Sequence, residues 1–177
     1  MQPSQPSLPE RWLKMELFTD YHRIIGDIMT AELRTNGVLN SEAPQMLLER
    51  VNTTYLQRLQ GETIASGYSR INKASVVIAI PNDEHETERL ARASKIYIRG
   101  ELLQHRVMIG LSNFEVSGNL HLNPDMELTG AFLQRTELFI GVTDATVIFL
   151  PNPSFRFTAS SVLINRNRVD FICAGAP

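Results

Sequence analysis

The chain has 177 residues, a formal net charge of −2 at pH 7 and 43% hydrophobic residues. This apolar content can build one large or two small cores, which excludes a globally disordered chain. The slightly acidic balance is a poor footprint for sequence-independent nucleic-acid binding, which needs a concentrated basic surface.

The N-terminal segment is rich in Pro, Ser and Gln and lacks the basic and apolar regions of a signal peptide. We therefore interpret residues 1–12 as a disordered tail. No apolar run approaches the roughly 20 residues that span a bilayer, and the single cysteine, Cys173, excludes an internal disulfide. We expect a cytoplasmic protein with no membrane span.

Residues 13–81 have the pattern of a first β unit. The segments Lys14–Phe18 and Arg23–Thr30 predict a hairpin, and Gly26 marks a bulge or tight bend in its second strand. The polar residues Thr19 and Asp20 between the two segments are typical of a turn and support this pairing.

The rest of this unit predicts one helix and two strands. Ser41 can cap a helix over about residues 42–52, whose apolar stripe contains Met46, Leu47 and Val51. Strands follow at 53–66 and 75–80. The second of these is continuously apolar at its end, so we expect it to be buried on both faces.

Residues 82–95 differ in kind from both flanking regions. Asp83 and Glu86 have capping-box spacing, and Glu88 and Arg92 form an i,i+4 pair. The segment predicts a charged surface helix that connects two units.

Residues 96–177 have the pattern of a second β unit. A short helix is expected between about 124 and 133, after Pro124 breaks the preceding strand. The predicted strands are 95–100, 106–111, 115–122, 138–150, 154–164 and 168–173.

The two units resemble each other in sequence. Leu17–Ile28 shares its order of residue types with Gly110–Leu120, and Ile71–Ile78 matches Ile164–Ile172. Two similarities in the same order and at nearly the same offset indicate a duplicated unit. The predicted fold class is mainly β with short helices, as a tandem duplication of two small barrel-like or strongly bent sheets.

The second unit, and more weakly the first, resembles the Sm/LSm family of small β-barrels, which includes the bacterial RNA chaperone Hfq. The resemblance lies in three segments: Val107–Ile109 with Val116–Leu120, Val142–Val147, and Val162–Val169. The segment 139–145 is also similar to uncharacterised bacterial β domains. The resemblance implies Sm-like barrels whose strand edges pair into larger assemblies.

The family's RNA-binding residues do not carry over residue by residue. Its Asp and Asn before the third strand find their nearest match in Asp125–Leu128, which lacks the Asn. Its Arg-Gly turn is replaced by Asn165-Arg166. The resemblance therefore implies the shape of the family but not its RNA site.

The residues show no catalytic or metal-binding constellation. The four histidines have no metal-ligand spacing, and Cys173 lacks a nucleophile signature. Asp144 has no visible acid–base partner, and no phosphate-binding glycine motif occurs. We predict no enzyme activity, no cofactor and no metal.

Two surfaces are candidate partner contacts. In the strand-like segment 95–100, Ile96, Tyr97 and Ile98 are bracketed by charge, as in a guarded sheet edge; a second candidate edge is 155–161. Near the C-terminus Arg156, Arg166 and Arg168 give a positive local balance that suits an acidic partner or a phosphate backbone.

These features predict a non-enzymatic binding, scaffold or assembly module that acts through protein–protein contacts, including self-association. The alternative is an Sm-like RNA-binding protein. A third hypothesis is an unrecognised enzyme, and a polar pocket with converging titratable groups would favour it.

Overall fold

The computed structural model describes residues 11–32, 34–58, 62–81, 102–124, 130 and 136–174. The expected connecting helix over 82–95 lies outside these residues, as does nearly all of the expected helix over 124–133. In the first half, the elements are β1 (Arg11–Phe18), β2 (His22–Thr30), α1 (Thr35–Asn40), β3 (Gln45–Tyr55), β4 (Ile64–Asn72) and β5 (Ile78–Pro81). Two short 3₁₀ turns, η1 (Leu56–Arg58) and η2 (Lys73–Ser75), follow β3 and β4.

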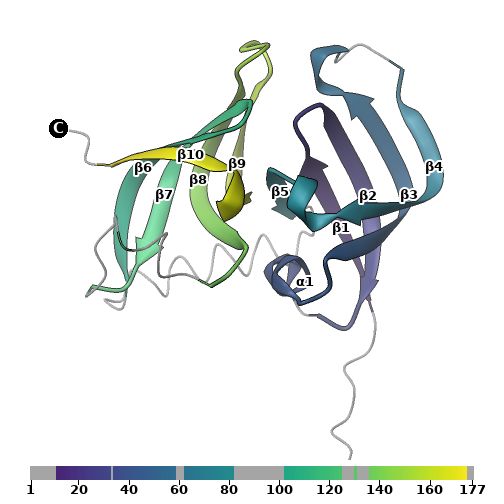
Figure 1. Cartoon of the computed structure of the whole chain (residues 1–177), viewed down its shortest axis with the longest axis horizontal. Coiled ribbons are helices and arrows are strands. Elements are labelled where there is room, and N and C mark those ends of the chain that lie inside the picture. Colours follow the sequence, from purple (N-terminus) through teal and green to yellow (C-terminus); the bar gives the residue numbers. More distant parts are fainter. Residues whose placement is uncertain are drawn as a thin grey trace, which may run out of the picture.

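The second half contains five further strands. They are β6 (Leu103–Leu111), β7 (Phe114–Leu122), β8 (Phe139–Phe149), β9 (Arg156–Asn165) and β10 (Val169–Ala174), with the 3₁₀ turn η3 (Arg166–Arg168) between β9 and β10. Each half is a strongly curved sheet, and β5 of the first half meets β9 of the second half where the two sheets join (Figure 1).

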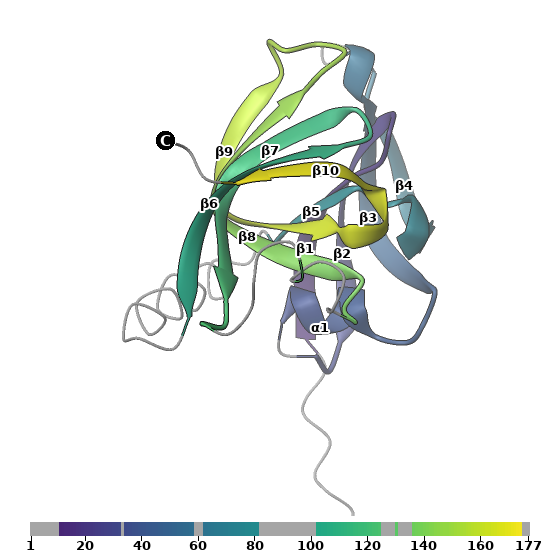
Figure 2. The ribbon, with the colours of Figure 1, turned by 60° about the vertical axis from the view of Figure 1, so that its left-hand side comes forward.

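All ten strands belong to one sheet, in the order β10-β6-β7-β8-β9-β5-β1-β2-β3-β4. Every neighbouring pair is antiparallel. The prediction of a mainly β fold is confirmed. Within the described residues the sheet is open, with β4 and β10 as its outer strands. Figure 2 brings the second half forward, with β10 beside β6.

The predicted first hairpin is confirmed as β1 and β2, joined at Thr19–Tyr21. Strand β1 begins at Arg11, so it includes two residues that the sequence assigns to the tail. The pairing of β2 with β3 shifts register between Ile25 and Asp27, so the irregularity expected at Gly26 is present, but the extra residue of the bulge belongs to β3, where Arg50 and Val51 lie opposite Gly26.

The helix expected over 42–52 is wrong, because residues 45–52 of this segment form the first part of β3. Met46 and Leu48 are buried while Leu47 between them is exposed, which is the two-residue period of a strand. The period is disturbed at Arg50, whose φ of 52° is a bulge conformation. That bulge made the apolar spacing look helical.

The two halves arrange their strands in the same order: β5-β1-β2-β3-β4 and β10-β6-β7-β8-β9. Gly26 pairs with Met15 in the first half, and Gly118 pairs with Val107 in the second. Register shifts follow at both glycines, between Ile25 and Asp27 and between Ser117 and Asn119.

The strand opposite each glycine bends at a residue with positive φ: Arg50 at 52° and Asp144 at 48°. Each of these residues bonds to the side chain that follows the glycine. Arg50 Nε donates to Asp27 Oδ2 at 2.9 Å, and Asn119 Nδ2 donates to Asp144 Oδ2 at 3.1 Å. The carboxylate of Asp144 therefore has a structural partner on the neighbouring strand.

The largest apolar cluster extends from the second half into the first. Phe18 of β1 stacks on Phe157 of β9, with ring centroids 5.4 Å apart, and meets Phe114 edge-on at 5.9 Å. Ile78 and Val77 of the first half belong to the same cluster. The halves therefore share buried apolar surface, which holds them together.

Candidate functional site

The junction between the halves is a short ladder of β5 and β9. Ile78 pairs with Ile164 and Ala79 pairs with Leu163. The backbone N–H of Asn165 extends the ladder by donating to the Val77 carbonyl at 2.9 Å.

The Asn165 side chain fastens this junction. Its Nδ2 donates to the carbonyl of Val76 at 2.8 Å and to that of Lys73 at 3.4 Å. Its Oδ1 accepts from the backbone N–H of Asn167 at 3.0 Å and caps η3. Asn165 is fully buried, so these partners replace the water that the amide loses.

Two further contacts tie the halves together. Arg168 forms an ion pair with Asp20 and also donates to Ser112 Oγ at 2.9 Å. Asn40 at the end of α1 binds the backbone of Phe139 in both directions, accepting from its N–H at 2.7 Å and donating to its carbonyl at 3.0 Å.

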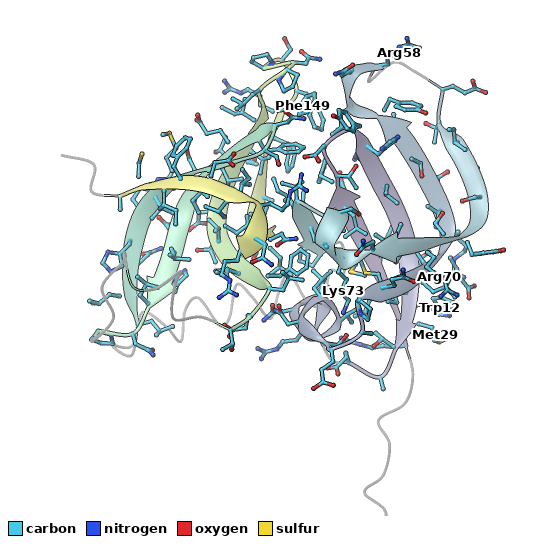
Figure 3. All side chains as sticks on the ribbon, in the orientation of Figure 1. Trp12, Met29, Arg58, Arg70, Lys73 and Phe149 are labelled. Atoms are coloured by element: carbon cyan, nitrogen blue, oxygen red, sulfur yellow. The ribbon has the colours of Figure 1, made fainter. Side chains whose placement is uncertain are left out.

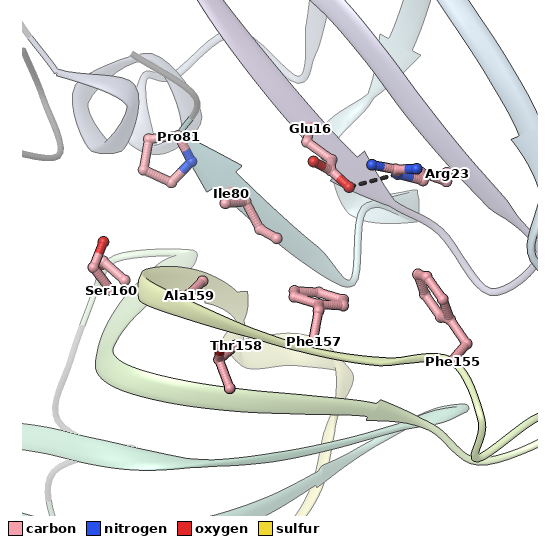
Figure 4. Close-up of a pocket in the computed structure, with 10 residues that line it drawn as sticks. Glu16, Arg23, Ile80, Pro81, Phe155, Phe157, Thr158, Ala159 and Ser160 are labelled. Carbon is pink, nitrogen blue, oxygen red and sulfur yellow. Dashed lines mark hydrogen bonds and ion pairs between the residues drawn. The ribbon is translucent and has the colours of Figure 1, made fainter. Parts of the chain in front are cut away.

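A cleft of about 360 Å³ opens where β9 diverges from β5 (Figure 4). Ile80, Pro81 and Phe157 line it, together with the Glu16–Arg23 ion pair, whose atoms are 2.6 Å apart. Along this cleft, residues 156–161 of β9 pair with β8 alone. The predicted edge at 155–161 is therefore the inner wall of a cleft between the halves.

Within the described ranges, the two outer strands of the sheet, β4 and β10, each pair on one side only. On β4, Ile64 and Tyr68 are 51% and 72% exposed, and on β10 Phe171 is 50% exposed. Figure 3 shows Arg70 of β4 on the outer side of the first half. Unpaired backbone and exposed apolar side chains together make these strands candidate binding edges.

The predicted partner contacts do not form one surface. Ile96, Tyr97 and Ile98 lie outside the described residues. Arg156 is exposed at the start of β9, whereas Arg166 and Arg168 lie in η3, beyond the other end of that strand. Arg168 is engaged by Asp20, so its charge is largely compensated.

Lys73 is a buried cation that the sequence does not reveal. It lies beside α1 (Figure 3) and is 2% exposed. Its Nζ donates to the Val38 carbonyl and to Ser41 Oγ, both at 2.7 Å, and to the Ser41 carbonyl at 3.1 Å. Desolvation lowers the pKa of this amine from its ordinary value of 10.5. With all three donors engaged, Lys73 caps the C-terminal end of α1.

Within the described ranges, no group of three or more His, Cys, Asp or Glu side chains is arranged to hold a metal. His121 Nε2 lies 2.8 Å from Thr143 Oγ1 on the neighbouring strand. Cys173 is a free, exposed thiol on β10. None of the helices in the described part of the chain is long and apolar enough to cross a membrane.

The comparisons with known proteins returned no match: no family model, no curated protein and no solved structure is similar to this chain.

Proposed function

We propose that this chain is a non-enzymatic assembly module made of two Sm-like β units in tandem. It binds a protein partner through the unpaired edges of its outer strands. One observation carries the proposal: among the residues that the structure describes, both outer strands of the ten-strand sheet have an unpaired edge and exposed apolar side chains, including Tyr68 on β4 and Phe171 on β10. Such an edge recognises an extended backbone through main-chain hydrogen bonds.

The duplication supports the proposal. The two halves share their strand order, both glycine bulges and the bonded pairs Arg50–Asp27 and Asn119–Asp144. A curved five-strand sheet with a bend at a glycine in each half supports the Sm-like part of the proposal. An open sheet of this kind has two edge strands with unpaired backbone groups, whereas a closed barrel has none.

RNA binding, the alternative, has weaker support in the described residues. Arg168 is paired with Asp20, and Arg156 lies at the far end of β9 from Arg166. Salt-dependent RNA binding that disappears on reversing the charges of Arg166 and Arg168 would favour this alternative.

The test is a matched pair of substitutions at one position of β4. Arg70→Pro removes a backbone N–H from the outer edge, whereas Arg70→Ala removes only the side chain. We expect light scattering of the pure protein, or titration with a co-purified partner, to show association that Arg70→Ala retains and Arg70→Pro loses. A protein that stays monomeric and binds no partner through this edge would contradict the proposal.

A further inference from the structure

The internal junction contains the same two strand positions that lie free at the ends of the sheet. In the junction, the outer edge of β9 pairs with the outer edge of β5. By strand order, β9 corresponds to β4 and β5 corresponds to β10. The chain therefore has one copy of this edge pair joined inside the molecule and one copy separated at its two ends.

The strand register shows which residues of β10, at the end of the sheet, correspond to which residues of β5, at the junction. Phe18 of β1 and Gly110 of β6 are equivalent, because each lies three positions after the residue opposite its bulge glycine. Phe18 pairs with Ile78, and Gly110 pairs with Phe171. Ile78 and Phe171 therefore hold the same place in the two halves.

The partner strand follows the same rule. Asn72 pairs with Gln45 at the start of β3, and Asn165 pairs with Phe139 at the start of β8. Each asparagine caps the 3₁₀ turn that follows it, through Ala74 N–H at 3.1 Å in η2 and Asn167 N–H at 3.0 Å in η3. Asn72 is thus the counterpart of Asn165.

The two copies of the edge pair, β9 with β5 and β4 with β10, differ in how far their residues are buried. Residues 78–81 of β5 are all buried, whereas their counterparts 171–174 of β10 are mostly exposed. Asn165 is fully buried with its Nδ2 on two carbonyls across the junction, while Asn72 is exposed. In the described part of the chain, no carbonyl of another strand takes the place of those two carbonyls beside Asn72.

We propose that β4 of one molecule pairs with β10 of a second copy, head to tail, in the register of the β9–β5 junction. This inference rests on the proposed function and names its partner. Arg70 then lies opposite Ile172, and Ile71 lies opposite Phe171. The Asn72 amide reaches the Arg166 and Val169 carbonyls of the next molecule. Such a heterologous contact repeats, and it generates a ring if the rotation closes or a filament if it does not.

One feature of the internal junction is not repeated between molecules. The Arg168–Asp20 ion pair of the junction corresponds to Ser75 of one copy and Ser112 of the next, which carry no charge. The association between copies therefore lacks this ion pair, and its dependence on salt should be small.

The first test is Asn72→Asp. The aspartate keeps an oxygen to cap Ala74 N–H but removes the donor and places a negative charge against carbonyls of the next copy. We expect self-association in analytical ultracentrifugation to weaken about tenfold or more, with the melting temperature of the dilute monomer unchanged. Unchanged association would overturn the register.

The second test separates head-to-tail pairing from symmetric pairing by disulfide cross-linking. Both proteins carry Cys173→Ser. One also carries Arg70→Cys, and the other also carries Ile172→Cys. Residues directly opposite in an antiparallel pair lie about 4.5 to 5.5 Å apart at Cα, within the range of a disulfide. We expect a cross-linked product only when the two proteins are mixed and oxidised.

The matched control replaces Ile172→Cys with Phe171→Cys, which turns the thiol to the other face of the sheet. Equal cross-linking with this control would overturn the register, and cross-linking within either protein alone would overturn the head-to-tail arrangement. If the pure protein stays monomeric but a different protein binds with the Arg70→Pro dependence described above, the assembly function stands and the second copy is excluded as the partner.

Discussion

Replacing Gly118 with alanine should destabilise the protein because β8 passes too close for a side chain. An added Cβ would lie 2.5 Å from Val142 Cγ1 and 2.8 Å from the carbonyl oxygen of Thr143. The valine methyl can rotate, but the carbonyl belongs to the ladder. Since ordinary contact begins near 3.4 Å, β7 and β8 must separate by about 0.6 Å at this bulge. Overpacking of this kind costs roughly 1–3 kcal/mol, and Gly118→Val should reach at least that cost.

The chain provides two internal controls. At Gly141 the nearest atom to an added Cβ is 3.8 Å away, and at Gly26 the nearest contacts lie between 3.1 and 3.2 Å. Urea unfolding followed by far-ultraviolet circular dichroism should rank the losses as Gly118→Ala, then Gly26→Ala, then Gly141→Ala. Gly141→Ala should stay within about 0.5 kcal/mol of the parent. A loss below about 0.5 kcal/mol for Gly118→Ala would refute the argument from close approach.

Three further predictions concern buried or bridging polar side chains. Asn165→Ala should lower the free energy of unfolding by roughly 1–3 kcal/mol, because it leaves the Val76 carbonyl and Asn167 N–H without their partners. In the same urea titration, Asn72→Ala in the monomer should lower the free energy of unfolding by less, since Asn72 is exposed. Lys73→Met should cost roughly 1–3 kcal/mol by uncapping α1. Because the pKa of Lys73 is lowered, the folded state binds fewer protons than the unfolded state just below pH 10.5. The free energy of unfolding of the wild type should therefore increase relative to that of Lys73→Met as the pH rises toward 10.5. A difference between the two proteins that decreases over this range would contradict the prediction. Arg168→Ala should cost at most about 1 kcal/mol, since its ion pair with Asp20 is partly exposed, and the cost should shrink when urea unfolding is repeated in 1 M salt.

The parts of the fold that the sequence predicts are those with short-range signals. The first hairpin has a turn between two apolar segments, and Gly26 and Gly118 lie where the neighbouring strand approaches closely, Gly118 more so than Gly26. Ile71 and Ile164, which begin the matching segments, each lie one position before the end of their strands, β4 and β9. These signals are local, so they survive without knowledge of the tertiary structure.

The misassigned helix over 42–52 shows where local signals fail. Leu48 and Val51 are both buried, and the extra residue of the bulge at Arg50 sets them three positions apart, a spacing that also places residues on one face of a helix. A bulge is defined by the partner strand, which lies next to β3 only after folding. The sequence alone therefore cannot separate a bulged strand from a short amphipathic helix.

The strand edges predicted from the sequence are not the outer strands of the sheet in the described residues. A free strand edge was expected at 155–161, yet that segment borders the cleft, and the outer edges are β4 and β10. The difference arises because the end strands of a sheet depend on strand order, which long-range pairing decides. Arg168 appeared as a basic contact, although the compensating Asp20 lies 148 positions earlier in the chain.

The β5–β9 junction has a consequence for synthesis on the ribosome. The ladders that join β1 to β2 and β5, and β3 to β2 and β4, involve residues 11–81 alone, so they can form as soon as Pro81 has emerged. The strand that covers the outer edge of β5, around Leu163, is made about 85 residues later. At roughly 5–20 residues per second, the apolar edge of β5 stays unpaired on each nascent chain for several seconds or longer. During that interval β4 and β5 of neighbouring nascent chains on one messenger RNA expose the same complementary edges, which makes premature pairing between unfinished copies the characteristic hazard of this fold.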